Sequence, residues 1–288
     1  MKHAKAVFGE RGRFMRYVTG GIILAGLIVA SQFQDADAQP TGCNAAVIHT
    51  HTNKVSKKGK MVPERSVDVR AGANDDGAAF YMSKMAIDAD GSPNAYHPDP
   101  NKGLDALSSA GFGKSCNVLV CKVEGQPKQG YVTIPSGPFQ GFFVSMSTLN
   151  DKSKTREDHE RYVSATHVPY VAIAGSVAKK LKLVPGDVAF AINLKNGERS
   201  GAIFADIGTE NTLGEASIAL ADKLKVPSSP KTGGAGYQIF YVVFPNTKTT
   251  PPWPRDTSEF VKAATEKFEK WGGINRVKAC EPAAKNLS

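Results

Sequence analysis

The sequence has 288 residues, of which 41% are hydrophobic and 22% are charged. This is the composition of a globular protein with one large domain or two small ones, and it excludes collagen-like, coiled-coil, disulfide-knot and wholly disordered classes. The formal charge is +9, from 36 Lys and Arg residues against 27 Asp and Glu residues. Because no Lys/Arg-rich helix with interleaved aromatic residues carries this charge, we expect no nucleic-acid partner.

The N-terminal segment predicts an export signal. Five basic residues precede the apolar run from Val18 to Ala30, and Ala36-Asp37-Ala38 follows as an A-x-A cleavage pattern. These features predict a signal peptide over residues 1–38, with cleavage before Gln39. The alternative is an uncleaved anchor, but the apolar run has 13 residues, fewer than the ~20 needed to span a bilayer. We therefore expect a secreted or periplasmic monomer with no stable membrane insertion.

Export makes disulfide bonds the expected state of the four cysteines, and their spacing fits no zinc motif. If residues 117–120 form a strand, Cys116 and Cys121 lie roughly 16 Å apart and on opposite faces, too far to bond each other. We therefore predict that Cys43 and Cys280 each bond one member of that pair. The alternative is four free buried thiols.

Residues 39–74 are polar and basic, and they predict an exposed lead-in with one strand near Ala45–Thr50. Residues 75–246, the predicted catalytic domain, are rich in short β-branched runs between Gly and Pro, which favour strands. The predicted strands are Asn117–Val123, Tyr131–Ile134, Gly141–Ser145, Tyr170–Ala174, Val188–Leu194, Gly201–Ala205 and Gln238–Phe244. Helices are expected at Gly103–Ala110, Ser176–Leu181 and Glu215–Leu224.

These elements predict a mainly β (α+β) fold, a closed or partly closed barrel with a few short helices. Asn196-Gly197 predicts a hairpin turn between two of the strands. The turn Pro185-Gly186-Asp187 directly precedes a strand and resembles the turn of double-psi barrels, so a barrel of that kind is expected.

The C-terminal region, residues 247–288, predicts a Pro-rich connector and a helix packed on the domain. Asp256 and Glu259 are spaced as a capping box, and Gly272 supplies a stop signal. Five apolar side chains fall on one face of this helix: Phe260, Val261, Ala264, Phe268 and Trp271. Because apolar helical faces are normally buried against a core, we expect this one to cover the barrel.

Two carboxylates are the candidate catalytic groups. Asp206 ends a β-run just before Gly208, and nine residues later Glu215 opens a predicted helix. Two such acids can converge on one cleft and flank a glycosidic bond, one protonated as the general acid and one ionised as the general base. The structural alternative is a turn at Asp206 and a capping box from Thr212 to Glu215.

A second cluster suits sugar recognition. The segment from Asp88 to Pro98 contains Asp88, Asp90, Asn94, Tyr96 and His97, whose side chains can hydrogen-bond hydroxyl groups or pack on a sugar ring. It begins like a calcium loop but lacks the later ligands and the closing Glu. The alternative is an Asp-Gly turn followed by an ordinary loop.

Several colinear segments resemble the catalytic domain of glycoside hydrolase family 75, the fungal-type chitosanases. They occur in the family's order across roughly residues 75–246: Asp88–Pro98, Gly103–Leu107, Arg161–Val163, Val168–Tyr170, Ala202–Gly208, Leu213–Leu220 and Val243–Pro245. The chain departs from the family beside the acids, with Ile207 in place of Val, Thr209 in place of Pro and Ala216 in place of Gly.

The resemblance implies endo-acting, inverting hydrolysis of β-1,4-linked glucosamine chains, with the family's essential Asp at Asp206 and its essential Glu at Glu215. We favour Glu215 as acid and Asp206 as base, and we expect no metal or organic cofactor. Because chitosan is a polycation, a basic chain needs a locally acidic cleft to bind it. Its expected lining is Asp88, Asp90, Asp105, Asp206, Glu210 and Glu215.

Two other functions fit the same residues. A glycosidase or lytic transglycosylase acting on peptidoglycan would use mainly one acid. A non-catalytic, carbohydrate-binding envelope protein would use the acids only for structure.

Overall fold

The computed structural model of the protein describes residues 42–287. The predicted signal peptide, residues 1–38, lies outside the described residues. The described residues all belong to one compact unit. None of the helices within residues 42–287 combines the length and the apolar character needed to cross a bilayer.

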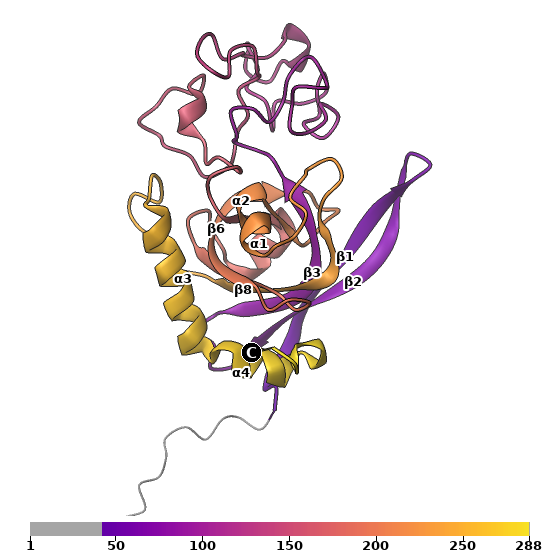
Figure 1. The fold of residues 1–288 in the computed structure, drawn as a ribbon, viewed down its shortest axis with the longest axis vertical. Helices are drawn as coiled ribbons and strands as arrows, with labels where there is room; N and C mark the ends of the chain where they lie inside the picture. Colours follow the sequence, from indigo (N-terminus) through magenta and orange to yellow (C-terminus); the bar gives the residue numbers. More distant parts are fainter. Residues whose placement is uncertain (1–41, 288) are drawn as a thin grey trace, which may run out of the picture. The chain divides into compact units, whose positions relative to one another are not determined.

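Eight strands form one sheet, and six of them close into a barrel (Figure 1). The strands are β1 (Ala45–Lys57), β2 (Lys60–Gly72), β3 (Ala79–Asp88), β4 (Tyr170–Ala174), β5 (Val188–Asn193), β6 (Arg199–Gly208), β7 (Glu215–Ser217) and β8 (Ala235–Phe244). They pair in the order β1-β2-β3-β7-β4-β6-β5-β8, and pairing of β3 with β8 closes the ring. The predicted strand-rich closed barrel is therefore confirmed.

The barrel's two turn predictions are also confirmed. β5 and β6 form an antiparallel hairpin, and Gly197 in its turn has φ +78°, a backbone conformation that favours glycine. Asp187 is fully buried, and its carboxyl accepts backbone N–H groups of Val184, Thr247 and Lys248 at 2.8–3.0 Å. This one carboxylate therefore joins the turn before β5 to the segment that follows β8.

Two hydrophobic clusters occupy the two faces of the barrel wall, because successive strand residues point to opposite sides. On β5, Ala189 and Ala191 belong to the cluster that includes α1 (Gly175–Leu181) and α2 (Ile218–Lys223). Phe190 belongs to the other cluster, which packs under the C-terminal helices.

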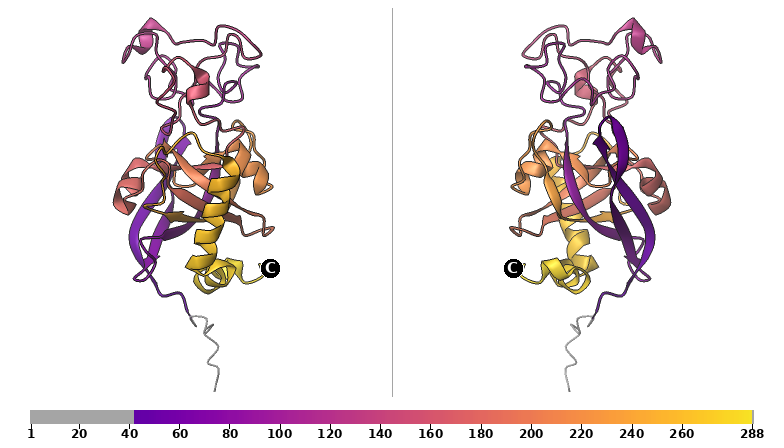
Figure 2. Two further views of the ribbon diagram at one scale, coloured as in Figure 1. Left: turned by 90° about the vertical axis from the view of Figure 1, so that its left-hand side faces the viewer. Right: turned by 90° about the vertical axis from the view of Figure 1, so that its right-hand side faces the viewer.

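The predicted C-terminal helix is present as α3 (Thr257–Trp271), followed by α4 (Gly273–Cys280). Asp256 caps α3 by accepting the Ser258 N–H, and Gly272 ends it. Phe268 stacks on Phe190 with ring centroids 4.0 Å apart, so the apolar face of α3 covers the barrel as predicted (Figure 2).

Residues 89–169 form a long insertion between β3 and β4 that lies beyond the end of β3, on one side of the barrel (Figure 1). Its regular structure consists of two 3-10 helices, Pro127–Gln129 and His159–Arg161. The strands predicted at 117–123, 131–134 and 141–145 appear here only as isolated bridges, such as Leu119 to Ser145. The helix predicted at Gly103–Ala110 is wrong, since this stretch is a series of turns.

The predicted disulfide pairing is wrong, although all four cysteines are bonded as expected. Cys43 bonds Cys280, and Cys116 bonds Cys121. The prediction assumed an extended strand between Cys116 and Cys121, but the chain bends there and brings their Cα atoms to 5.5 Å. Two disulfides are typical of proteins from oxidising compartments.

The predicted lead-in differs as well. Residues 45–72 form a long antiparallel hairpin of β1 and β2, in which Lys58-Gly59 makes the turn. Only one residue pair, Arg70 with Phe80, joins this hairpin to β3 in regular register.

Candidate active site

The candidate catalytic acids lie on neighbouring strands of the barrel. Strand β4 runs between β6 and β7, and its residue Ala172 pairs with Asp206 on one side and with Glu215 on the other. Directly paired residues point to the same face of a sheet, so both acidic side chains rise beside the Ala172 methyl group. The barrel thus brings the two predicted residues together, one strand to either side of a small side chain.

A β-bulge sets the direction of Asp206. The register between β4 and β6 shifts so that Val171 pairs with Phe204 while Ala172 pairs with Asp206, and Ala205 is left as the extra residue. Bulges re-aim side chains and are common next to active sites. Without the shift, Ala172 would face Ala205, and Asp206 would point to the opposite side of the sheet.

Glu215 begins strand β7, not the helix that the sequence predicts. It pairs with Ala86 of β3 as well as with Ala172 of β4. The helix begins later, because the Ser217 hydroxyl accepts the Leu220 N–H and caps α2. The predicted capping box from Thr212 to Glu215 is therefore wrong, and the Glu215 carboxyl stays available to the cleft.

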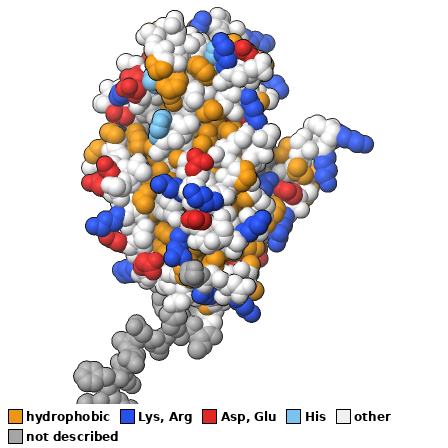
Figure 3. Space-filling view, viewed as in Figure 1, with side chains coloured by type: hydrophobic (Ala, Val, Ile, Leu, Met, Phe, Trp, Pro, Cys, Tyr) orange, Lys and Arg blue, Asp and Glu red, His pale blue; other side chains and the backbone are white. Residues whose placement is uncertain are grey.

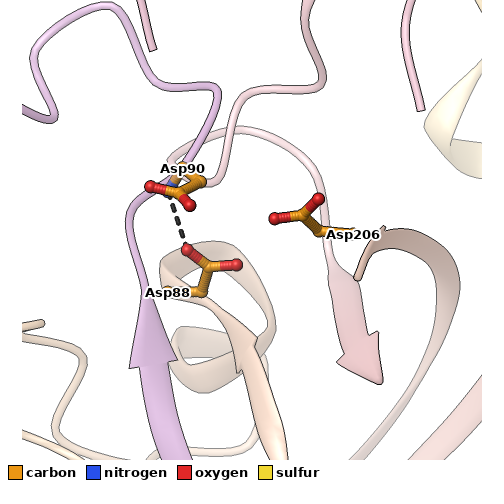
Figure 4. A group of neighbouring side chains, drawn as sticks. All are labelled: Asp88, Asp90 and Asp206. Carbon is orange, nitrogen blue, oxygen red and sulfur yellow. Dashed lines mark hydrogen bonds between the residues drawn. The ribbon is translucent and has the colours of Figure 1, made fainter. Parts of the chain in front are cut away.

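Asp88 and Asp90 extend the acidic group at the end of β3. Asp88 and Glu215 share a face, because Ala86 and Asp88 are the partners of Glu215 and Ser217 in the parallel pairing of β3 with β7. The Asp90 N–H donates to Asp88 Oδ1 at 2.8 Å, and carboxylate oxygens of Asp88, Asp90 and Asp206 lie within 4.8 Å of one another (Figure 4). The three carboxyls face one shared space.

A cleft of about 680 Å³ opens between this face of the barrel and the insertion. Six acidic residues line it, and no Lys, Arg or His is among its lining residues. The acids are the six expected from the sequence: Asp88, Asp90, Asp105, Asp206, Glu210 and Glu215. The insertion supplies the facing wall through Ser109, Ser115, Asn117 and Thr148.

Of the predicted sugar-binding residues, Tyr96 lines the cleft, whereas Asn94 and His97 do not. The Tyr96 hydroxyl donates to Asp90 Oδ1 at 2.7 Å. The Asn94 carbonyl accepts the Leu104 N–H, and His97 packs edge-on against Phe142 while its Nδ1 accepts the Asp99 N–H. In this structure Asn94 and His97 therefore hold the insertion together.

Burial raises the pKa of several of these carboxyls. The pKa of Asp88 is raised to about 7, first by burial and then by the negative charge of Asp206. Burial and the charges of Asp88 and Asp206 hold the pKa of Glu215 well above its usual range. The pKa of Asp90 is raised for similar reasons, since burial and the charge of Asp88 both oppose its ionisation. Around Asp88, Asp90 and Glu215 the cleft thus favours protonated carboxyls.

Asp206 differs from Glu215 in its hydrogen bonds. The backbone N–H and the hydroxyl of Thr148 both donate to Asp206 Oδ1, the former at 2.8 Å. Burial raises the pKa of Asp206, and these donors act in the opposite direction by stabilising its charged form. No hydrogen bond to the Glu215 carboxyl is among those described for residues 42–287.

The sixth acid, Glu210, is exposed at the rim of the cleft. It accepts hydrogen bonds from the N–H and the hydroxyl of Ser176 at the start of α1. These bonds lower its pKa, so Glu210 carries a full charge in neutral solution.

Thr148 and Tyr170 also belong to the site, but the sequence does not predict either of them as a site residue. The Tyr170 hydroxyl donates to the Asp90 carbonyl at 3.1 Å from the fully buried start of β4. Nothing in the local sequence marks Thr148, which lies 58 positions before Asp206. Only the path of the insertion brings it there.

Asp88, Asp90 and Asp206 also form the group, among the described residues, whose oxygens are spaced closely enough to hold a metal ion. Hard divalent cations prefer such carboxylate oxygens.

No protein-family model matches the chain, and no curated protein matches it at a significant level.

Proposed function

We propose that the protein is a secreted, endo-acting glycoside hydrolase that cleaves β-1,4 linkages of chitosan by inverting, two-carboxylate catalysis. The proposal combines the resemblance to family 75 with the arrangement of acids around Ala172. Neither support depends on a metal or an organic cofactor.

The observation that carries the substrate class is the charge of the cleft. Six carboxyls and no basic side chain line it, although the whole chain has a formal charge of +9. A glucosamine polymer carries an ammonium group on each sugar, and such groups would be drawn into this cleft and repelled by the rest of the surface. Each bound ammonium would lower the pKa of a neighbouring carboxyl and so strengthen its own binding.

The environments of the two acids support a division of roles. Burial and the neighbouring charges raise the pKa of Glu215 and so favour its protonated form, which would donate a proton to the leaving oxygen. Asp206 has two hydrogen bonds from Thr148 that favour its ionised form, so it would accept a proton from the attacking water. Carboxyls whose environments differ in this way are the usual arrangement for acid and base in one site.

The strand spacing supports the inverting course. Asp206 and Glu215 are separated by β4, and two strand spacings amount to roughly 9.5 Å between their backbones. Inverting enzymes hold the two carboxyls about 6.5–9.5 Å apart to leave room for a water molecule. A backbone separation of this size, across a strand that presents only the small side chain of Ala172 between the two acids, is compatible with such an arrangement.

The test is release of reducing ends from chitosan by residues 39–288 and by two variants, Asp206→Asn and Glu215→Gln. In the first variant the amide oxygen of the new side chain can still accept both Thr148 hydrogen bonds, so this variant isolates the loss of charge. Glu266→Gln, at an exposed acid on α3, is the matched control. We expect both cleft variants to lose activity by about 10²-fold or more while folding normally, and the control to match the wild type.

Two results would overturn the proposal. Cleft variants as active as the wild type would show that other groups catalyse the reaction. A wild type inactive on chitosan that releases anhydro-sugars from peptidoglycan would assign the cleft to a lytic transglycosylase instead.

A further inference from the structure

The distal part of the β1–β2 hairpin stands away from the body of the protein (Figures 1 and 3). Its last contacts with the body are the Lys54 N–H, which donates to the Asn211 carbonyl, and Glu64, which pairs with Lys84 at 2.8 Å. No hydrogen bond or ion pair described for residues 42–287 joins residues 55–62 to anything outside the hairpin. The tip is therefore free to meet a partner.

The tip is strongly basic. Lys54, Lys57, Lys58 and Lys60 are all exposed within seven residues, and none of them has an acidic partner among the ion pairs described for residues 42–287. Figure 3 shows basic side chains at the end of the projecting arm. The nearest acid along the hairpin, Glu64, is already paired with Lys84.

This arrangement opposes local stability. Lys57 pairs directly with Lys60 across the hairpin, and like charges directly opposite each other destabilise a strand pair. Lys58 has φ +50°, at a turn position that favours Gly, Asn or Asp. Residues that break local preferences concentrate at functional sites. Protection of exposed strand edges would explain Lys54, Lys57 and Lys60, because β2 joins β3 in regular register only at Arg70, but it would not explain Lys58 in the turn.

An apolar side chain accompanies the lysines. Met61 is 48% exposed and follows Lys60 at the tip, where it would gain nothing from a soluble polyanion. A bilayer surface uses both kinds of group, because ammonium groups meet lipid phosphates while an apolar side chain enters the interface. Three of the four lysines, Lys57, Lys58 and Lys60, lie at or beside the turn, and a convex tip of this kind matches a plane better than a long polymer chain.

We propose that the tip of this hairpin, residues 54–61, docks on a bilayer surface rich in anionic phospholipids. The docking is peripheral and reversible, since each lysine near such a surface strengthens partitioning roughly fivefold and four together several-hundred-fold. The inference goes beyond the proposed glycosidase activity and does not depend on it, because none of residues 54–61 lines the acidic cleft.

The experiment is co-sedimentation of residues 39–288 with vesicles of equimolar phosphatidylglycerol and phosphatidylcholine, and with phosphatidylcholine vesicles alone. We expect binding only to the anionic vesicles, weakened by salt. The triple variant K57Q/K58Q/K60Q should lose about 10²-fold in partitioning. The variant K262Q/K267Q/K270Q removes the same charge from exposed positions on α3 and should bind nearly as the wild type does.

The variant Met61→Ser distinguishes a bilayer partner from a soluble polyanion, because only a bilayer would take up the apolar side chain. We expect this variant to bind vesicles several-fold more weakly than the wild type. The proposal is overturned if the wild type does not bind anionic vesicles, or if the α3 variant loses as much as the tip variant. It is also overturned if Met61→Ser leaves vesicle binding unchanged while soluble polyphosphate displaces the protein from vesicles at equal phosphate concentration. Chitosan hydrolysis by the tip variant is measured in parallel, so failure of docking and failure of the proposed activity stay distinguishable.

Discussion

Thr148 donates two hydrogen bonds to the same oxygen of Asp206, one from its backbone and one from its hydroxyl. A residue in the insertion thereby stabilises the charge of a residue on the barrel. Both donors favour the ionised carboxylate, which is the form of Asp206 that the proposed mechanism requires.

Thr148→Val removes the hydroxyl and keeps the shape of the side chain. We expect the pKa of Asp206 to rise, so that the acidic limb of the pH–rate profile moves to higher pH. At pH values on that limb kcat/KM should fall roughly tenfold, as for loss of one hydrogen bond to a charged group. The profile of kcat/KM against pH is the measurement. Thr148→Ser keeps the hydroxyl and should leave the acidic limb of the pH–rate profile where it is in the wild type. If the wild type, Thr148→Val and Thr148→Ser all have the same acidic limb, the Thr148 hydroxyl does not stabilise the charge of Asp206.

Ala172→Val fills the space between Asp206 and Glu215. We expect kcat to fall by roughly tenfold to a hundredfold, because in the proposed mechanism the two acids and a water molecule share that space. Overpacking should also reduce the free energy of unfolding by about 1–3 kcal/mol. Ala191→Val, at a fully buried alanine on β5 away from the cleft, is the control. It should lose comparable stability and keep its kcat, so an equal loss of kcat in both variants would argue against a specific role for Ala172.

Asp88 makes stability depend on pH. Its pKa is raised from 3.8 in the reference state to about 7 in the folded chain, so the folded state binds the extra proton between these values. Its contribution is therefore fully present at low pH and is lost as pH rises through 7. Asp88→Asn removes this dependence, and its stability relative to the wild type should increase from pH 4 to pH 7. Urea denaturation across that range is the measurement.

For Asp256→Asn we expect the opposite dependence of stability on pH. Hydrogen bonds from Ser258 lower the pKa of Asp256, so its contribution is lost as pH falls. Relative to the wild type, this variant should become less stable as pH rises through the acid range toward the ordinary Asp pKa of 3.8, and the difference should stay constant above it, so urea denaturation for this variant is extended to lower pH. Parallel trends in Asp88→Asn and Asp256→Asn would contradict the explanation.

Removal of the two disulfides should affect stability and activity differently. Cys43–Cys280 closes a loop of 237 residues and Cys116–Cys121 a loop of five. Loop entropy predicts that removing the first by a double Ser substitution costs about 5 kcal/mol and removing the second about 2 kcal/mol. The short loop contains Asn117 and Val118, which line the cleft, so its removal should cost more activity. The melting temperature should fall more when Cys43–Cys280 is removed, and kcat/KM should fall more when Cys116–Cys121 is removed. Both quantities are measured for both double variants.

The barrel could be predicted from sequence because its strands are locally marked. Tyr170–Ala174 was predicted with its observed bounds, since a short β-branched run between Pro and Gly has little alternative. Asp206 could be predicted as a cleft residue for the same reason, as it lies at the end of such a run. The acidic lining was predictable from the substrate that the resemblance implies.

Other features depend on contacts between distant residues. Glu215 fits a helix start by local pattern, but pairing with Ala86 and Ala172 makes it a strand residue. The Cys116–Cys121 bond needs a bend that the strand-like sequence Asn117-Val-Leu-Val120 does not suggest. Residues 45–72 looked exposed because their hairpin has few buried positions, although the backbone pairing of β1 and β2 is nearly continuous.

The insertion leaves the barrel after Asp88 and returns at Tyr170, so one uninterrupted stretch of chain supplies the wall opposite the paired acids. Residues within the insertion could be replaced, added or removed without disrupting the pairing of the barrel strands. Glu215 and Asp206 would keep their places on β7 and β6 while the facing surface changed in length, charge or aromatic content. The fold therefore places the proposed catalytic residues on the barrel and most of the residues that would determine substrate specificity on the insertion. These two sets of residues can therefore change at different rates during evolution.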